Sequence, residues 1–182
     1  TIAAEFTERL TPVMTAVVMG HGLDEGTTLG PVITAKQRDR IAGLVDEAVS
    51  RGATVTTGGE VPDGPGTFYP ATVLTDVPAD ARILHEEIFG PVATVSTFAT
   101  LDEGVRRAND TEYGLAAYGF SASAETAQYL ATHLDAGMVG VNRGAISDAA
   151  APFGGVKQSG FGREGGVEGI EEYLETRYIA LS

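Results

Sequence analysis

The sequence predicts an α/β fold in which a largely parallel sheet is flanked by helices. Segments with apolar residues at helical spacing alternate along the chain with short runs of β-branched residues. Strand, helix, strand units of this kind favour parallel strands that are covered by helices. Two capping boxes, which begin at Thr34 and Thr100, mark helix starts. With 182 residues, of which 43% are hydrophobic, the chain is long enough to form one core.

The amino-terminal half is expected to contain two helices and three strands. Apolar residues at every third or fourth position predict a helix over residues 2–17, which Pro12 should kink or divide. The capping box Thr34–Gln37 opens a second helix that ends at Gly52. Runs rich in β-branched residues predict strands over residues 53–57, 68–74 and 92–98.

The carboxyl-terminal half continues the alternation and then departs from it. Helices followed by strands are expected over residues 101–108 with 116–121 and over 124–134 with 138–141. After a glycine-rich loop, residues 167–173 are expected to be helical. Residues 175–181 alternate like an exposed strand, which alone would leave an unpaired edge. The expected organisation is therefore one domain over residues 1–174 and a carboxyl-terminal strand over 175–182.

The composition excludes several classes of function. The net charge is −13 and the pI is near 4.5, so nucleic acid is not expected as a partner. The absence of cysteine excludes disulfides and thiolate metal sites, and the three histidines form no ligand pair, so no metal is expected. No apolar run approaches the roughly 20 residues of a membrane span, and no export leader is evident. We therefore expect a cytoplasmic protein that does not bind membranes.

Two loops far apart in the sequence carry most of the functional information. His85–Val92 and Pro152–Glu164 each place aromatic residues among glycines, prolines and charges, a mixture typical of loops that approach a ligand. The glycines of the second loop lose much backbone entropy on folding, which suits a main chain that must pack closely. A flexible tail is the alternative, but Phe153, Phe161 and Val156 argue against disorder.

Both loops, together with Asn109–Leu115 between them, resemble the carboxyl-terminal half of the NAD(P)-dependent aldehyde dehydrogenases. The resemblance extends over essentially all 182 residues in the same order. Within that family, the run from Gly137 to Gly165, followed by Ile170–Glu175, is most similar to succinate-semialdehyde dehydrogenase. The resemblance implies oxidation of a small aldehyde with NAD or NADP, and a homo-oligomer that assembles through the terminal strand.

The family's chemistry, as the resemblance implies it, uses a cysteine thiolate that attacks the aldehyde before hydride passes to the nicotinamide. This chain contains no cysteine. The nucleophile, the general-base glutamate, the oxyanion asparagine and the nucleotide-binding fold are therefore expected upstream. The chain is expected to be a fragment cut just after the nucleophile, without a catalytic residue of its own and inactive when alone.

Four residues match coenzyme-contacting positions of the family. Glu87 stands where a carboxylate accepts hydrogen bonds from the nicotinamide ribose, and Phe89 stands where a ring packs near the nicotinamide. Gln37 aligns with a further contact, although its place in a capping box explains it equally well. Leu115 lies where the backbone approaches the carboxamide, but a leucine that enters a strand is usually part of the core.

The loop from Asn142 to Phe153 is expected to contact the substrate. By resemblance, Ser147 and Phe153 face the aldehyde tunnel, and a serine hydroxyl there helps to hold the distal carboxylate of a semialdehyde. A serine that stabilises a turn is the alternative. Arg143 could bind a carboxylate through its guanidinium, but an intramolecular or intersubunit salt bridge is favoured.

The other charged residues of the two loops have simpler explanations. A pair of glutamates is more typical of a solvated surface than of a site, and Glu86 and His85 are expected to face solvent. Lys157 and Arg163, within the glycine-rich loop, are expected to fix that loop rather than to contact substrate.

Three interpretations of function follow. The chain is part of an aldehyde dehydrogenase, or a non-catalytic assembly module, or an α/β ligand-binding domain whose loops match by coincidence. Two long motifs in the same order argue against coincidence. The first two interpretations are compatible because a truncated enzyme keeps its assembly surface. The choice between NAD and NADP depends on the missing nucleotide-binding fold.

Overall fold

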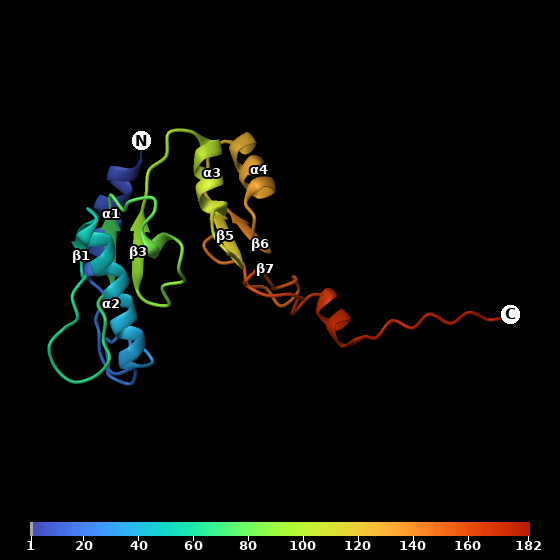
Figure 1. Ribbon diagram of the computed structural model, residues 1–182, viewed down its shortest axis with the longest axis horizontal. Coiled ribbons are helices and arrows are strands. Elements are labelled where there is room, and N and C mark those ends of the chain that lie inside the picture. Colours follow the sequence, from blue (N-terminus) through green and yellow to red (C-terminus); the bar gives the residue numbers. More distant parts are fainter. Residues whose placement is uncertain (1) are drawn as a thin grey trace. The chain divides into compact units, whose positions relative to one another are not determined.

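A computed structural model describes residues 2–182 and divides them between two compact units (Figure 1). The first unit ends at Thr97 and the second begins at Phe98. Both units are α/β, and the strands of the described residues form three small sheets. Over the same residues, no helix is long and apolar enough to cross a membrane.

The first unit is built on a three-stranded sheet. Its strands are β1 (Thr54–Thr57), β2 (Thr72–Thr75) and β3 (Val92–Val95), in the order β1-β2-β3. β2 and β3 are parallel, with Thr72 opposite Val92. β1 and β2 are antiparallel, because the loop that joins them contains no helix to return the chain in the parallel direction.

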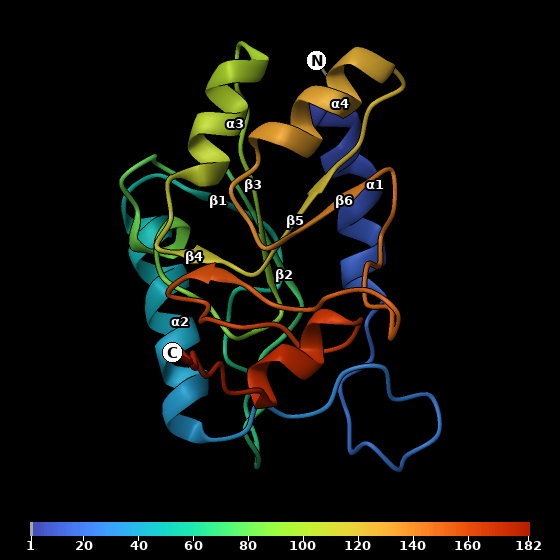
Figure 2. The same ribbon diagram turned by 90° about the vertical axis from the view of Figure 1, so that its right-hand side faces the viewer.

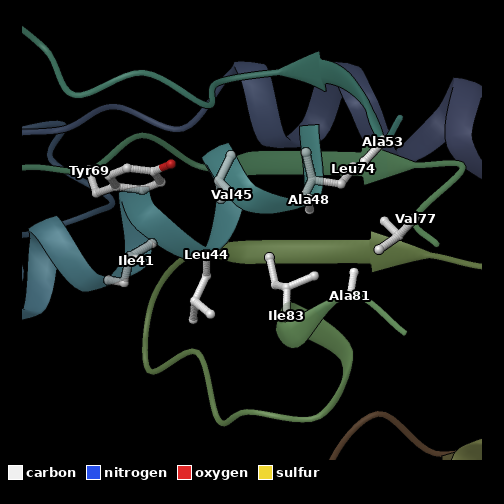
Figure 3. Close-up of a cluster of buried hydrophobic side chains, with 10 residues drawn as sticks. All are labelled: Ile41, Leu44, Val45, Ala48, Ala53, Tyr69, Leu74, Val77, Ala81 and Ile83. Carbon is white, nitrogen blue, oxygen red and sulfur yellow. The ribbon is translucent and has the colours of Figure 1, made fainter. Parts of the chain in front are cut away.

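Helix α2 (Ala35–Ser50) supplies much of the core of this unit. Thr34 caps the helix, since its side chain accepts a hydrogen bond from the Gln37 amide. The buried face of α2 packs with side chains from β2 and from the 3-10 turn η1 (Arg82–Leu84) (Figure 3). The core cluster consists of Ile41, Leu44, Val45, Ala48, Ala53, Tyr69, Leu74, Val77, Ala81 and Ile83. Burial in this cluster is the largest cause that raises the pKa of Tyr69 to about 12.

Helix α1 (Ala3–Thr15) packs against β1 and β2. The hydroxyl oxygens of Thr11 and Thr56 are 3.1 Å apart and join the helix to β1. Pro12 was expected to kink or divide this helix; it does not divide it, because the helix continues through Pro12 to Thr15. Pro12 lies in the last turn, where the chain has little helix left to disrupt.

The second unit contains two helices and two small sheets. Its elements are α3 (Leu101–Asn109), β4 (Tyr113–Gly114), β5 (Ala116–Gly119), α4 (Ala124–His133), β6 (Met138–Val141), β7 (Val156–Lys157) and the 3-10 helix η2 (Glu168–Tyr173). β5 pairs with β6 in parallel, and β4 pairs with β7 in antiparallel. α3 and α4 lie side by side (Figures 1 and 2), and the Tyr129 hydroxyl donates a 2.6 Å hydrogen bond to the Asp102 carboxylate.

Most elements occur where the sequence predicts them, although several strands are shorter. The Thr100 cap is confirmed, since its hydroxyl accepts a hydrogen bond from the Glu103 amide. The largely parallel sheet is not formed within the described chain, where two strand pairings are parallel and two are antiparallel. The β4–β7 pair was not predicted, because strands of two residues are too short to show a periodicity.

The carboxyl-terminal segment differs most from expectation. Residues 175–182 are exposed and have neither helix nor strand assignment. The predicted strand therefore does not form in the single chain, because a strand requires a second backbone and no described segment of this chain supplies one. Tyr178, Ile179 and Leu181 are left largely exposed.

Candidate functional site

The loop of residues 85–91, which follows η1 and precedes β3, is held by side chains from α2. The Gln37 side-chain amide donates hydrogen bonds to the carbonyls of Ile88 (3.0 Å) and Phe89 (3.4 Å). The Gln37 backbone amide donates at 3.1 Å to the Thr34 hydroxyl. Gln37 therefore belongs to the helix cap and also anchors the loop that carries the predicted coenzyme contacts.

Arg40, one turn further along α2, holds the adjacent part of the loop. Its Nη1 donates to the carbonyls of Glu87 (2.8 Å) and Ile88 (3.3 Å). Its Nη2 lies 3.1 Å from Glu86 Oε2, and Glu86 Oε1 lies 2.7 Å from Arg82 Nε. Sequence reasoning missed Arg40. The signal that could have found Arg40 is its spacing of three residues from Gln37, which places both side chains on one face of the helix.

Glu86 was wrongly expected to face solvent. Its side chain is about one-third exposed and lies between two arginines. The hydrogen bond from Arg82 is the main cause that lowers the pKa of Glu86, and the positive charges of Arg82 and Arg40 act in the same direction. The i,i+4 spacing of Arg82 and Glu86 could have indicated one of these ion pairs, but Arg40 comes from α2, far away in the sequence. His85 is exposed as predicted, with its Nε2 at 3.0 Å from the Ala79 carbonyl.

Phe89 and Glu87 extend from this anchored backbone. Phe89 has a φ of 52°, a conformation uncommon for a residue with a side chain, and it is 74% exposed. The following residue, Gly90, lies so close to the buried Ile41 that an added Cβ would overlap that side chain. Glu87 is exposed, and its carboxylate has no hydrogen-bond or ion-pair partner among residues 2–182. The loop thus offers a free carboxylate and an exposed aromatic ring, two residues apart.

In the second unit, the glycine-rich loop of residues 152–166 closes on itself. Phe153 and Glu164 exchange backbone hydrogen bonds of 2.6 Å and 2.7 Å. Arg163 Nη1 donates to the carbonyls of Gly155 (2.8 Å) and Gly162 (2.7 Å). Arg163 therefore fixes the loop, as the sequence predicts.

Lys157 joins this loop to the segment that follows α3. Its Nζ lies 2.8 Å from the Asp135 carboxylate and donates to the carbonyls of Asn109 (3.1 Å) and Thr111 (3.3 Å). The Asn109 side chain donates in turn to the His133 carbonyl (2.7 Å) and accepts from the Asp135 amide (2.9 Å). Lys157 is thus also a structural residue, and Asn109 connects the carboxyl ends of α3 and α4.

A cavity of about 600 Å³ lies against the glycine-rich loop. It is lined by Leu115, Phe153, Gly154, Gly155, Ser159, Phe161, Gly162, Arg163, Glu164, Gly165, Gly169, Glu172 and Tyr173. Two predicted contacts, Leu115 and Phe153, therefore meet at one cavity. Arg143 and Ser147 do not line it. Both are exposed, and their side chains make no hydrogen bond or ion pair with the described part of the chain. The intramolecular salt bridge that the sequence favoured for Arg143 therefore does not form within residues 2–182.

Asn142 was also missed by sequence reasoning, and it fixes the start of the predicted substrate loop. Its side-chain oxygen accepts from the Ser121 amide at 2.9 Å, and its side-chain nitrogen donates to the Ser121 carbonyl at 2.9 Å. Its φ of 55° turns the backbone at the end of β6, a geometry that asparagine tolerates better than most residues.

The predicted site residues are distributed over both units. Gln37, Glu87 and Phe89 belong to the first unit, whereas Leu115, Arg143, Ser147 and Phe153 belong to the second. Among residues 2–182, no group of histidine, aspartate or glutamate side chains is arranged to hold a metal ion. The first unit thus offers polar and aromatic contacts on an anchored loop, and the second offers a cavity.

Residues 1–179 match the aldehyde dehydrogenase family, and the chain belongs to that family. It is 52% identical over 181 residues to a succinate-semialdehyde dehydrogenase of Paenarthrobacter nicotinovorans, of which it covers 40%. It is 41% identical to the NADP(+) succinate-semialdehyde dehydrogenase of Escherichia coli K12, with 97% of this chain and 36% of that enzyme covered. The chain thus spans about two-fifths of the length of these curated relatives.

A solved structure shares the fold. The betaine aldehyde dehydrogenase of Staphylococcus aureus, determined in complex with NAD+, superposes with a TM-score of 0.90 at 42% sequence identity. The superposition covers 98% of this chain and 37% of that one. The arrangement of helices and small sheets described above is therefore that of a segment of an aldehyde dehydrogenase.

Gly137→Ala is expected to destabilise the second unit. A Cβ at residue 137 would overlap the carbonyl oxygen of Gly154 and would lie 2.8 Å from the Cα of Gly155, and backbone atoms cannot rotate away. We expect the free energy of unfolding in urea to fall by about 1–3 kcal/mol. Gly144→Ala is the matched control, because a Cβ there meets no atom within 4 Å. Equal effects of the two changes would contradict a close approach of the backbone at Gly137.

Proposed function

We propose that this chain is part of an NAD(P)-dependent aldehyde dehydrogenase that oxidises a small carboxylated aldehyde, with succinate semialdehyde as the first candidate. The observation that carries the proposal is the anchored 85–91 loop, which offers the free carboxylate of Glu87 and the exposed ring of Phe89. A carboxylate without a protein partner is available to accept hydrogen bonds from a ligand. Membership of the family and the names of the relatives support the choice of reaction and substrate.

The residues of this loop suit the nicotinamide riboside part of the coenzyme. Ribose hydroxyls are hydrogen-bond donors, which the ionised carboxylate of Glu87 accepts strongly. The Phe89 ring offers a flat apolar surface for the nicotinamide. NAD(P)+ supplies the hydride acceptor when it is bound. Both coenzymes stay open for this chain, since one relative is named for NADP(+) and the solved structure contains NAD+.

Two further residues are proposed near the coenzyme. The side-chain amide of Gln37 donates its hydrogen bonds to the loop carbonyls. We therefore propose that Gln37 holds the loop beside the ribose and does not bind the ribose itself. Leu115 is 41% exposed at the cavity, and its carbonyl accepts a hydrogen bond from the Met138 amide. We therefore propose that Leu115 offers its side chain, rather than its carbonyl, to the nicotinamide end of the coenzyme.

We propose that the loop after Asn142 recognises the substrate. Ser147 and Arg143 are exposed and have no competing partner among residues 2–182, so their donors are free for a carboxylate. Phe153 is held by its two backbone hydrogen bonds to Glu164 and presents its ring at the cavity. The two free donors suit the anionic far end of a short aldehyde, and the apolar ring of Phe153 at the cavity suits its carbon chain.

The remaining chemistry is proposed to come from residues outside this chain. The sequence contains no cysteine, so we propose that a thiolate nucleophile is supplied by residues outside this chain. We place the general base and the nucleotide-binding fold outside this chain as well. The chain covers about two-fifths of the curated relatives, so most of the length of such an enzyme lies outside it.

The terminal segment is proposed to pair with a second subunit. Tyr178 and Leu181 are each about nine-tenths exposed, and the backbone of residues 175–182 has no ladder within the chain. Another chain can satisfy such a backbone and cover such side chains by strand addition. A non-catalytic assembly module is the second candidate function, favoured by the same segment and by the absence of cysteine. A Gly-Gln-x-Cys sequence encoded directly upstream would decide for the enzyme.

Glu87→Gln is expected to slow hydride transfer in the complete enzyme by about tenfold or more, because a displaced nicotinamide loses the near-contact geometry that transfer requires. The aldehyde KM should change little. Pre-steady-state absorbance of the reduced coenzyme measures the step. Glu60→Gln, which removes another exposed glutamate of the first unit, is the control. An unchanged transfer rate in Glu87→Gln would remove this residue from the site.

Ser147→Ala is expected to lower kcat/KM for succinate semialdehyde more than for an uncharged aldehyde of similar length. Only the charged substrate loses a hydrogen bond to its carboxylate, and such a bond contributes about 1.5–3 kcal/mol. Steady-state assays with the two aldehydes measure the difference. An equal loss for both would indicate that Ser147 folds the loop and does not contact the substrate.

Deletion of residues 175–182 is expected to weaken the oligomer, since it removes the backbone that pairs with the partner. Sedimentation velocity of the complete protein over a range of concentrations measures the effect. Replacement of Tyr178 and Ile179 by serine keeps the chain length and should weaken the oligomer in the same direction. An equally tight oligomer after the deletion would show that the segment lies outside the interface.

A further inference from the structure

The Glu87 carboxylate and the Phe89 ring, the two exposed groups of the 85–91 loop, are not held in place by contacts of their own. The loop lies between η1 and β3 and has no regular secondary structure. The Glu87 carboxylate has no partner among residues 2–182, and the Phe89 ring is largely exposed. What fixes the segment is the set of side chains that bind its carbonyl groups.

We propose that Arg40 is a positioning residue for the reaction, which acts through the backbone of residues 86–88 and directs Glu87 toward the coenzyme. The inference rests on the proposed function for its catalytic consequence, and on the structure for the arrangement itself. Arg40 touches neither coenzyme nor substrate in this proposal. It holds the loop in the observed conformation, in which Glu87 is free and Phe89 has a left-handed backbone.

The guanidinium of Arg40 binds two backbone carbonyls and one side-chain carboxylate of the segment at the same time. Nη1 binds the carbonyls of Glu87 and Ile88, and Nη2 binds the carboxylate of Glu86. A planar fork with several fixed donors can make these contacts together, whereas an ammonium group is a point charge on a flexible stem. Lysine at this position would therefore keep the charge but not the geometry.

The same cluster decides which of two neighbouring glutamates is free. Glu86 is bound by Arg40 and also by Arg82, four residues earlier. Its charge is therefore compensated within the protein, while that of Glu87 is not. If Glu86 were released, the two carboxylates would become equivalent neighbours on a mobile loop, and the ribose would lose a single defined acceptor.

Arg51, which caps the carboxyl end of α2, provides a matched control because it makes a similar set of ion pairs. Its guanidinium pairs with Glu47 at 2.9 Å and with the Asp80 carboxylate, and it donates to the Asp80 carbonyl at 2.8 Å. Arg51 thus also joins α2 to the segment near η1, but it makes no hydrogen bond to the 85–91 loop. A general loss of helix packing would appear in both arginine variants.

The experiment compares Arg40→Gln, Arg40→Lys and Arg51→Gln in the complete protein. In the absence of coenzyme, the amide hydrogen exchange rate of the peptide 85–92 is expected to rise about tenfold in Arg40→Gln. This rise corresponds to a tenfold larger equilibrium constant for local opening of the loop. Hydride transfer is expected to slow by about tenfold to a hundredfold, with the aldehyde KM within about twofold. Arg40→Lys should fall between Arg40→Gln and the unmodified protein, and Arg51→Gln should match the unmodified protein.

Two results would overturn the proposal. One is unchanged exchange of the peptide 85–92 in Arg40→Gln, because the residue would then not hold the loop. The other is measurable hydride transfer that Arg40→Gln leaves unaltered, because the contact would then be structural only. An absence of hydride transfer in the unmodified protein would contradict the proposed function instead, and a faster exchange in Arg40→Gln would still support the anchoring of the loop.

Discussion

The binding of loop carbonyl groups by side chains of α2 is the constraint on which the first unit's candidate site depends. A loop without a ladder leaves its backbone acceptors unpaired, and these must find donors elsewhere. Gln37 and Arg40 supply them from one helix face. The same face of α2 carries Ile41 and Leu44, whose burial fixes the helix in the core. The free carboxylate of Glu87 is therefore a consequence of packing several residues away.

In the second unit, loop carbonyl groups are also bound by long charged side chains. Arg163 binds two carbonyls of the glycine-rich loop, and Lys157 binds the carbonyls of Asn109 at the end of α3 and of Thr111 just after it. Charged donors make stronger hydrogen bonds than neutral ones, so a few long side chains can hold a loop that has little regular structure. Glycine makes this possible at Gly137, where the backbone of the loop approaches too closely for a Cβ.

Local signals in the sequence predicted local structure well. The Thr34 and Thr100 caps form as expected because a capping hydroxyl needs only an amide three residues away. Pairings over long separations were harder. The antiparallel β1–β2 pair follows from a missing crossover helix, and the ion pair of Glu86 with Arg40 joins residues 46 apart in the sequence. The terminal strand of residues 175–181 was not found, since a strand cannot pair without a second backbone.

A crystal structure of the complete protein with NAD(P)+ would test the role of the anchored loop most directly. We expect a carboxylate oxygen of Glu87 within hydrogen-bond distance of a nicotinamide ribose hydroxyl, with the Arg40 and Gln37 contacts to the loop unchanged. A coenzyme whose nicotinamide ribose lies away from Glu87, or a loop that leaves α2 when the coenzyme binds, would contradict the arrangement proposed for this chain.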